Sequence, residues 1–218
     1  MFKNFASDAL GLSDIGKIIP PAQFNQTDVD DYVFHEDSER IYFVIKSKSD
    51  EYCFTNVAFL HLDGQSAVSK KRTLKRYPYR YFAPSQVMIE TAGTMDLDVE
   101  LKFVLSSQNM MSGKSAGNLA FSIDIDKSQI ESVRDIYKAL TAIAERCSSI
   151  AHHEEILNKS FDKITNMFQL RDIPETVILN LPDIINQTVQ QVEMGYHDRL
   201  NEIRQYDFGV VFEHYLRG

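Results

Sequence analysis

The chain has 218 residues, of which 44% are hydrophobic and 25% charged, and this composition is typical of a globular protein with one large domain or two small ones. Its formal net charge of −8 argues against a protein that binds nucleic acid through its overall charge. Cys53 and Cys147 match no metal or redox spacing and suit a reducing cytoplasm. The sequence has no run of about 18 apolar residues, so no transmembrane helix is predicted.

The first 21 residues form a broken amphipathic segment that Pro20 and Pro21 end. We expect no signal peptide, because acidic residues interrupt the apolar positions. Two interpretations remain open for this segment. It packs on the domain or on a neighbouring subunit, or it inserts into a membrane interface, which Asp8 and Asp14 disfavour.

Alternating apolar and polar residues then predict about seven antiparallel strands. Asp63 and Gly64 predict a hairpin turn, and Pro78 and Pro84 are expected to interrupt the strand pattern. The first strand is apolar on both faces in its middle. The predicted strands are Arg40–Ser47, Tyr52–Thr55, Val57–Leu62, Ala67–Tyr77, Gln86–Thr91, Leu97–Leu105 and Leu119–Asp126.

The stretch Ser128–Cys147 predicts an amphipathic helix, with Ser128 and Glu131 at the spacing of a capping box. A bent antiparallel sheet closed by this helix is the simplest way to bury both apolar faces. The fold class is therefore α+β. The positions that share the apolar face of the helix are Ile130, Val133, Ile136, Tyr137, Leu140, Ile143, Ala144 and Cys147.

Helical periodicity continues after Cys147, with a break near Pro174. The apolar stripes of this region are too wide for solvent-facing helices and must be buried against each other, the sheet or another copy of the chain. The candidate residues for an oligomer interface are Ile156, Phe161, Ile164, Phe168, Val177, Ile184, Ile185 and Val189. The run His152–Glu155 is interpreted as a solvated helix face, because adjacent histidines point apart and make a poor metal site.

Basic residues concentrate in the middle of the chain, where residues 66–148 carry 12 Lys and Arg against 9 Asp and Glu. One interpretation of this basic stretch is an anion site for a phospholipid headgroup, a phosphoprotein or another phosphate. The other is an edge strand protected by its charges, or ion pairs to the acids of a neighbouring subunit. The candidate residues are Lys70, Lys71, Arg72, Lys75, Arg76 and Arg80.

Several long segments resemble the bacterial pleckstrin-homology (PH) domain family of the YvbH-like type. They are SDALGLSDIGKIIPP (Ser7–Pro21), DDYVFHEDSERIYFVIKSKSDEYCFTNVAFLHLDG (Asp30–Gly64), SAVSKKRTLKRYPY (Ser66–Tyr79) and ETAGTMDLDVELKF (Glu90–Phe103). The resemblance implies a PH-like barrel of seven strands capped by a C-terminal helix. It also implies a helical hairpin extension that serves as an oligomerisation region. Proteins of this type resemble ring-forming modules, so the resemblance implies a ring, with a pentamer expected.

We therefore expect a PH-like domain over residues 1–148, including the amphipathic segment 1–21, and a helical oligomerisation region over residues 149–218. The predicted protein is a non-enzymatic, cytoplasmic scaffold that assembles with itself, with no catalytic residue, metal or cofactor and no nucleic-acid partner. A further protein partner is compatible with this role. The alternative is an adaptor at the inner face of the membrane that binds anionic ligands through the basic strand Lys70–Arg80.

Overall fold

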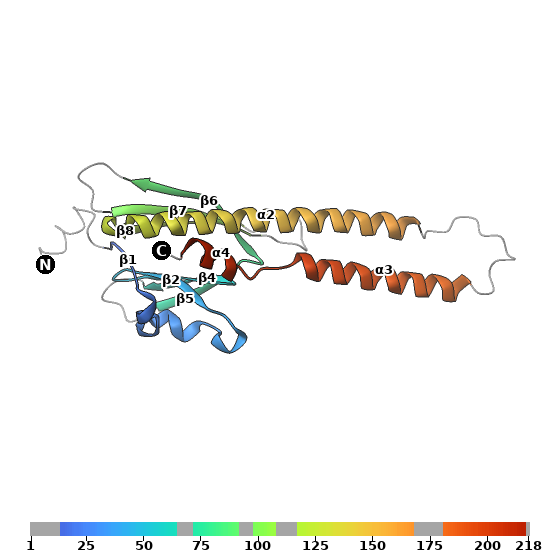
Figure 1. Cartoon of the computed structure of the whole chain (residues 1–218), viewed down its shortest axis with the longest axis horizontal. Helices are drawn as coiled ribbons and strands as arrows, with labels where there is room; N and C mark the ends of the chain where they lie inside the picture. The colour runs from blue at the N-terminus through green and yellow to red at the C-terminus, as the bar shows by residue number, and fades with distance from the viewer. Residues whose placement is uncertain (1–13, 65–71, 92–97, 108–116, 168–180, 217–218) are drawn as a thin grey trace, which may run out of the picture. The chain divides into compact units, whose positions relative to one another are not determined.

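The computed structural model describes residues 14–64, 72–91, 98–107, 117–167 and 181–216 (Figure 1). The chain divides into two compact units. The first is Met1–Cys147 together with Tyr206–Gly218, and the second is Ser148–Gln205. Within the described residues, no helix combines the length and the apolar character that crossing a bilayer requires. The N-terminal segment that was predicted to be amphipathic lies almost entirely outside the described residues.

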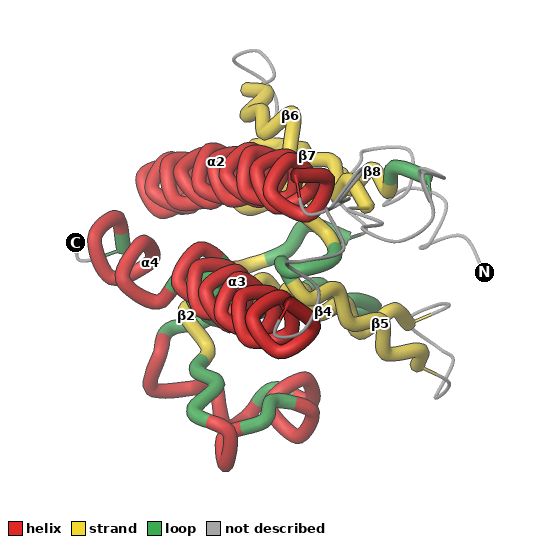
Figure 2. The backbone as a smooth tube through the Cα atoms, turned by 90° about the vertical axis from the view of Figure 1, so that its right-hand side faces the viewer, coloured by secondary structure: helices red, strands yellow, loops and turns green. Residues whose placement is uncertain are grey.

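Two antiparallel sheets form the body of the first unit (Figures 1 and 2). One sheet has the order β1-β2-β3-β4-β5 and the other has the order β6-β7-β8. Strands β2 to β8 are the seven predicted from the sequence, so the α+β, PH-like architecture is confirmed. The strands are β1 (Lys17–Ile18), β2 (Ile41–Lys46), β3 (Glu51–Thr55), β4 (Ala58–Gly64), β5 (Arg72–Pro78), β6 (Phe82–Thr91), β7 (Asp98–Ser107) and β8 (Leu119–Asp126).

Helices flank the strands. Among the described residues, short 3-10 helices precede β2 and follow β8, and two long α-helices and one short α-helix follow in the chain. The predicted apolar face of the first long helix is confirmed, since Val133, Ile136, Leu140, Ile143 and Cys147 are all buried. The helices are η1 (Pro21–Gln26), η2 (Asp28–Tyr32), η3 (His35–Asp37), η4 (Lys127–Gln129), α2 (Ile130–Met167), α3 (Leu181–Ile203) and α4 (Gly209–Tyr215).

Aromatic side chains fill the space between the two sheets. Phe59 of β4 lies 4.6 Å from Phe54 and 4.9 Å from Phe121, measured between ring centroids, and Phe103 lies 5.2 Å from Phe121. Phe54, Phe59 and Phe103 are each at most 1% exposed. Residues from both sheets thus share one interior, as their period-2 alternation requires.

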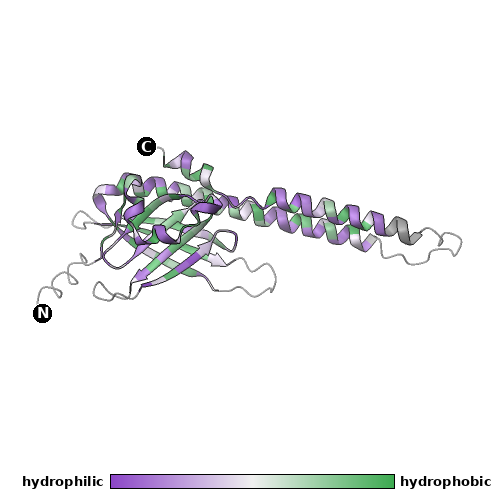
Figure 3. Cartoon of the chain, turned by 90° about the horizontal axis from the view of Figure 1, so that it is seen from below, coloured by the Kyte–Doolittle hydropathy of each residue, from purple (hydrophilic) through white to green (hydrophobic). Residues whose placement is uncertain are grey.

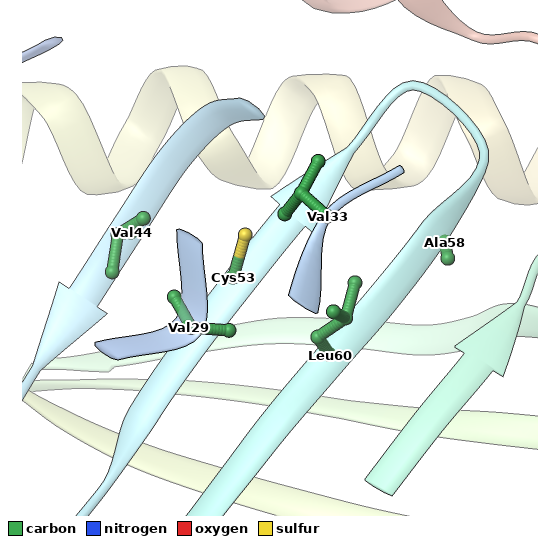
Figure 4. Packing of buried hydrophobic residues seen from close by; sticks show 6 residues of the cluster. All are labelled: Val29, Val33, Val44, Cys53, Ala58 and Leu60. Atoms are coloured by element: carbon green, nitrogen blue, oxygen red, sulfur yellow. The ribbon is translucent and has the colours of Figure 1, made fainter. Parts of the chain in front are cut away.

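A second apolar cluster lies on the opposite face of the first sheet (Figure 4). The segment of η1, η2 and η3 covers this face and buries Val29 and Val33 against Val44, Cys53 and Leu60. This cover explains why the β2 sequence is apolar on both faces, because Val44 faces the cluster while its neighbours face the interior.

The capping box predicted at Ser128 is wrong, because Ser128 lies inside the 3-10 helix η4. Asp126 is the N-cap of η4, and its side chain accepts a hydrogen bond from the backbone N–H of Ser128, with an N–O distance of 3.0 Å. A 3-10 turn then leads into α2. Both Asp and Ser are good capping residues, and only the end of β8 decides which of them leaves the extended conformation first.

The hairpin turn predicted at Asp63 and Gly64 is also wrong, because both residues pair with β5, opposite Thr73 and Arg72. Gly64 has a different role. A Cβ atom at this position would lie 2.4 Å from the carbonyl oxygen of Ser49, so only glycine allows the two backbones to approach. Pro84 likewise lies inside β6 rather than before it, next to an irregularity in the β6–β7 register.

The end of the described chain returns to the first unit. Phe208 N–H donates to the Asn56 carbonyl at 2.8 Å, and the Phe212 ring stacks on Tyr42 with centroids 4.9 Å apart. Phe208 and Phe212 are 1% and 0% exposed. The predicted boundary at residue 148 assigned this segment to the helical region, whereas the structure groups Tyr206–Gly218 with the barrel.

Candidate functional site

The predicted anion-binding strand corresponds to β5, which lies at the edge of the first sheet. Arg72 and Arg76 share one face of β5 with Leu74, and Leu74 packs against the second apolar cluster. The arginines therefore point to the face that the 3-10 segment covers. Lys70 and Lys71 lie outside the described residues.

Arg76 forms an ion pair with Glu39, which is 3% exposed. Its Nη2 atom lies 2.9 and 3.0 Å from the two carboxylate oxygens. Glu39 also accepts hydrogen bonds from the Thr55 hydroxyl at 2.5 Å and the Phe34 N–H at 2.9 Å. The Arg76 guanidinium lies 4.5 Å from the centre of the Phe34 ring. The Arg76 guanidinium and the Glu39 carboxylate thus both hold the 3-10 segment against the sheet.

Arg72 makes a similar pair of contacts. It donates to the Asp28 carboxylate, and its Nη1 atom lies 3.6 Å from Oε1 of the buried Glu51. The other oxygen of Glu51 accepts the Val29 N–H at 2.8 Å, and Lys46 Nζ lies 2.6 Å from Oε1. The acids of the 3-10 segment and β3 therefore already neutralise this arginine.

Lys75 points to the opposite face, where its Nζ atom lies 2.6 Å from Asp63 Oδ2. This hydrogen bond raises the pKa of Lys75. Arg80 follows β5, and its guanidinium lies 5.5 Å from the Tyr81 ring centroid. Arg72, Lys75 and Arg76 thus have carboxylate partners within the chain, while the prediction of anion binding stays a prediction.

The second unit is an antiparallel pair of helices, made by α2 after residue 148 and by α3 (Figures 1 and 2). Tyr196 of α3 donates to the Asn158 side chain at 2.6 Å, and its ring lies 4.5 Å from that of Phe161. Just after the end of α3, Arg204 Nε lies 2.7 Å from Glu154 Oε1. Glu154 is only 2% exposed, so the interpretation of His152–Glu155 as a fully solvated face is wrong at this residue.

Large apolar side chains of this helical pair remain exposed to solvent. Ile156 and Ile164 of α2 are 49% and 39% exposed, and Met194 of α3 is 59% exposed. Figure 3 shows hydrophobic and hydrophilic positions alternating along both helices. Of the other predicted interface residues, Phe161 and Val189 are half-buried. Phe168, Val177 and the side chains of Ile184 and Ile185 lie outside the described part.

A groove of about 240 Å³ lies between the two helices of this unit. Two predicted interface residues contribute to it, and its lining is mainly apolar. It is lined by Phe161, Thr165, Val189, Val192 and Glu193. The structure therefore places Phe161 and Val189, two of the predicted interface residues, in the lining of one groove.

The structure also brings together three ionisable residues that the sequence left apart. The ligand atoms of Asp50, His61 and Asp63 all lie within 4.8 Å of one another. His61 Nε2 is 3.0 Å from Asp50 Oδ1, and the imidazole stacks on Tyr52 with centroids 4.6 Å apart. Burial alone would raise the pKa of Asp50, but hydrogen bonds from His61 and Ser49 hold it below its ordinary value.

Comparison with known proteins then identifies the first unit. A family model described as "Bacterial PH domain" matches residues 9–144. The chain belongs to the bacterial PH domain family. It is 48% identical over 224 residues to the uncharacterized protein YvbH of Bacillus subtilis, with 99% of each chain covered. It is also 31% identical over 107 residues to the uncharacterized protein YjqA of the same organism, covering 49% of this chain and 76% of that one.

A solved structure extends the likeness beyond the PH domain. The crystal structure of a PH domain-containing bacterial protein from Exiguobacterium sibiricum matches with a TM-score of 0.76 and 43% identity, covering 94% of this chain and all of the other. Likeness to both this protein and YvbH thus extends through the helical unit as well as the PH domain. The predicted family and fold are therefore confirmed.

The cluster of Asp50, His61 and Asp63 was not predicted, because its members come from β4 and from the residue before β3. One part of this cluster could have been found from the sequence, and the other part follows only from the folded hairpin. His61 and Asp63 are two residues apart in a strand and so share a face. Glu51 pairs with Leu62 in the β3–β4 hairpin, which places Asp50 beside Asp63 one step further along.

Proposed function

We propose that this PH domain protein is a non-enzymatic scaffold whose helical unit, Ser148–Gln205, holds several copies together in a ring. Self-assembly of the copies gives the protein several identical PH domains in one particle. A pentamer is the assembly implied by the resemblance to YvbH-like proteins. Multiple copies would strengthen weak contacts of each domain with a further partner.

The exposed apolar surface of the helical unit carries this proposal. Two antiparallel helices bury only the faces that they turn toward each other, so Ile156 and Ile164 stay accessible to another chain. Soluble proteins rarely expose large contiguous apolar surface without a partner for it. The groove beside Phe161 and Val189 offers a place for an apolar side chain of a second copy.

The charged groups of the helical unit fit the same proposal. Glu154 and Arg204 pair near the base of the hairpin, which leaves the outward stripe of Ile156 and Ile164 to meet a neighbour. A partly buried ion pair of this kind favours one register of α2 against the residues that follow α3. A defined register presents the apolar stripe in one fixed orientation, as a closed ring requires.

The test is the mass of the full chain in solution by light scattering and sedimentation at micromolar concentration. The proposal expects a mass near five times the 25.0 kDa of one chain. Ile156→Glu/Ile164→Glu should lower this mass toward that of one chain. Gln190→Glu/Gln191→Glu adds the same number of carboxylates at exposed positions of the same unit and should leave it unchanged. A wild-type monomer would overturn the proposal.

A further inference from the structure

We propose that Asp50, His61 and Asp63 form a binding site for a divalent transition-metal ion, with Zn²⁺ as the best fit. The atoms available for coordination are one imidazole nitrogen and two carboxylate oxygens, all within 4.8 Å of one another. Zinc and cobalt are commonly held by this mixture of ligands, with water completing the coordination. The PH domain family and the self-assembly proposed above do not require such a site.

The fold holds the histidine in place without a metal. The His61 ring stacks on Tyr52 and meets the edge of Phe121, with centroids 4.6 and 6.0 Å away. The side chains of His61 and Asp50 are only 12% and 16% exposed. An imidazole fixed by packing on two sides loses little freedom when it binds an ion, which favours binding.

The surroundings of the cluster are acidic. The Ser49 hydroxyl lies 2.6 Å from Asp14 Oδ2 and 3.0 Å from Asp50 Oδ2, so a third carboxylate lies beside the cluster. Among the described residues, three carboxylates, those of Asp14, Asp50 and Asp63, therefore lie near a single lysine, Lys75, which leaves an excess of negative charge. A divalent cation would offset that excess.

Lys75 occupies part of the space that the ion would use. Its ammonium group lies 2.6 Å from Asp63 Oδ2, and its side chain is 42% exposed, so it is able to swing away into solvent. Lys75 and the ion therefore compete for the same carboxylate. Removing the ammonium should strengthen metal binding, whereas a purely structural ion-pair network would gain no affinity for metal from this change.

The experiment is a Co²⁺ titration of the untagged full chain, followed by its visible absorption, with Zn²⁺ added as a competitor. We expect saturation at one ion per chain and displacement by Zn²⁺. His61→Gln should weaken binding at least about tenfold, and Lys75→Met should tighten it about threefold or more. His197→Gln, which removes an exposed histidine of α3, is the matched control and should change nothing.

Asp63→Asn keeps the size of the side chain, and it provides a second variant in case His61→Gln does not fold. It should also weaken Co²⁺ binding at least about tenfold, with thermal unfolding of the metal-free protein confirming that it is folded. Absence of saturable binding up to about 1 mM Co²⁺, or equal affinity in wild type and both ligand variants, would overturn the proposal. The mass of the particle in solution is measured separately, with a chelator present. A failure of metal binding is thereby distinguished from a failure of self-assembly.

Discussion

Arg76 on β5 and Glu39, just before β2, form an ion pair with an N–O distance of 2.9 Å that fastens the 3-10 segment to the first sheet. The Glu39 side chain is 2% exposed and the Arg76 side chain 23% exposed. Removing one partner leaves the other charge poorly compensated. Arg76, one of the candidates for anion binding, is thus used within the fold.

Arg76→Met should lower the free energy of unfolding of the PH domain by about 2–3 kcal/mol, because Glu39 then keeps its charge in a buried position. The expected loss is smaller than for a fully buried ion pair, because the Arg76 side chain is partly exposed. Urea unfolding followed by circular dichroism measures the effect. The double variant Arg76→Met/Glu39→Gln should be more stable than the sum of the two single losses implies. Strict additivity would show that the two side chains do not act as a pair.

Gly64→Ala should destabilise the domain by about 1–3 kcal/mol, because the new Cβ atom would lie 2.4 Å from the Ser49 carbonyl oxygen and force the two backbones apart. Gly195→Ala is the control. Nothing lies within 4 Å of a Cβ atom at that position, and it is inside α3, so alanine should stabilise the helix by about 0.5–1 kcal/mol. Thermal melts of both variants should therefore shift in opposite directions.

Phe212→Ala should cost about 3–5 kcal/mol, because this ring is fully buried against Tyr42 and Phe43. Val210, two residues earlier in the same helix, is 70% exposed, and Val210→Ala should change stability by less than about 0.5 kcal/mol. Denaturant unfolding of the full chain compares the two. Similar losses for both variants would mean that α4 does not pack on the barrel in solution.

Asp124 and Asp126 lie on one face of β8. Their contributions to the free energy of unfolding should depend on pH in opposite directions. Burial raises the pKa of Asp124, and Asp98 and Glu100 raise it further, so the ionised form is unfavourable in the folded protein. Asp124→Asn should therefore stabilise the protein near neutral pH. This advantage should disappear once the pH falls below the ordinary range of an aspartate, where the wild-type side chain is also protonated in both states.

Asp126 is the opposite case, because hydrogen bonds from the Ser128 hydroxyl and backbone N–H lower the pKa of its carboxyl group. Its contribution to stability is present above the ordinary pKa of aspartate and is lost as the pH falls through the lowered value. Asp126→Ala should destabilise the protein at neutral pH and much less at the acidic end. Unfolding free energies measured from pH 7 down to pH 3 test both variants, and parallel curves would contradict the assignment.

The sequence predicted the strands and the first half of α2 well because both follow from local periodicity. The apolar face with Val133, Ile136 and Leu140 was correct for this reason. Errors arose where a distant segment decides the local conformation. Gly64 was interpreted as a turn residue, whereas its small size serves the approach of Ser49, which lies fifteen positions earlier in the chain.

The same limit applies to the candidate site. Basic residues such as Arg76 are visible in a sequence, but the acids that neutralise them come from other segments and appear only in the folded chain. The ligand atoms of His61 and Asp50 are likewise brought together by a hairpin register that strand periodicity alone does not specify.

The chain enters the helical unit through α2 and re-enters the barrel at Tyr206, so this unit is an insertion between two parts of one domain. A protease that cuts once between α2 and α3 would therefore release neither helix, since each remains covalently joined to the PH domain at its own end. Deleting everything after Cys147, in contrast, would remove Phe208 and Phe212 from the barrel together with the helical unit. A shortened chain meant to isolate the domain has to omit residues 148–205 and retain the segment that follows.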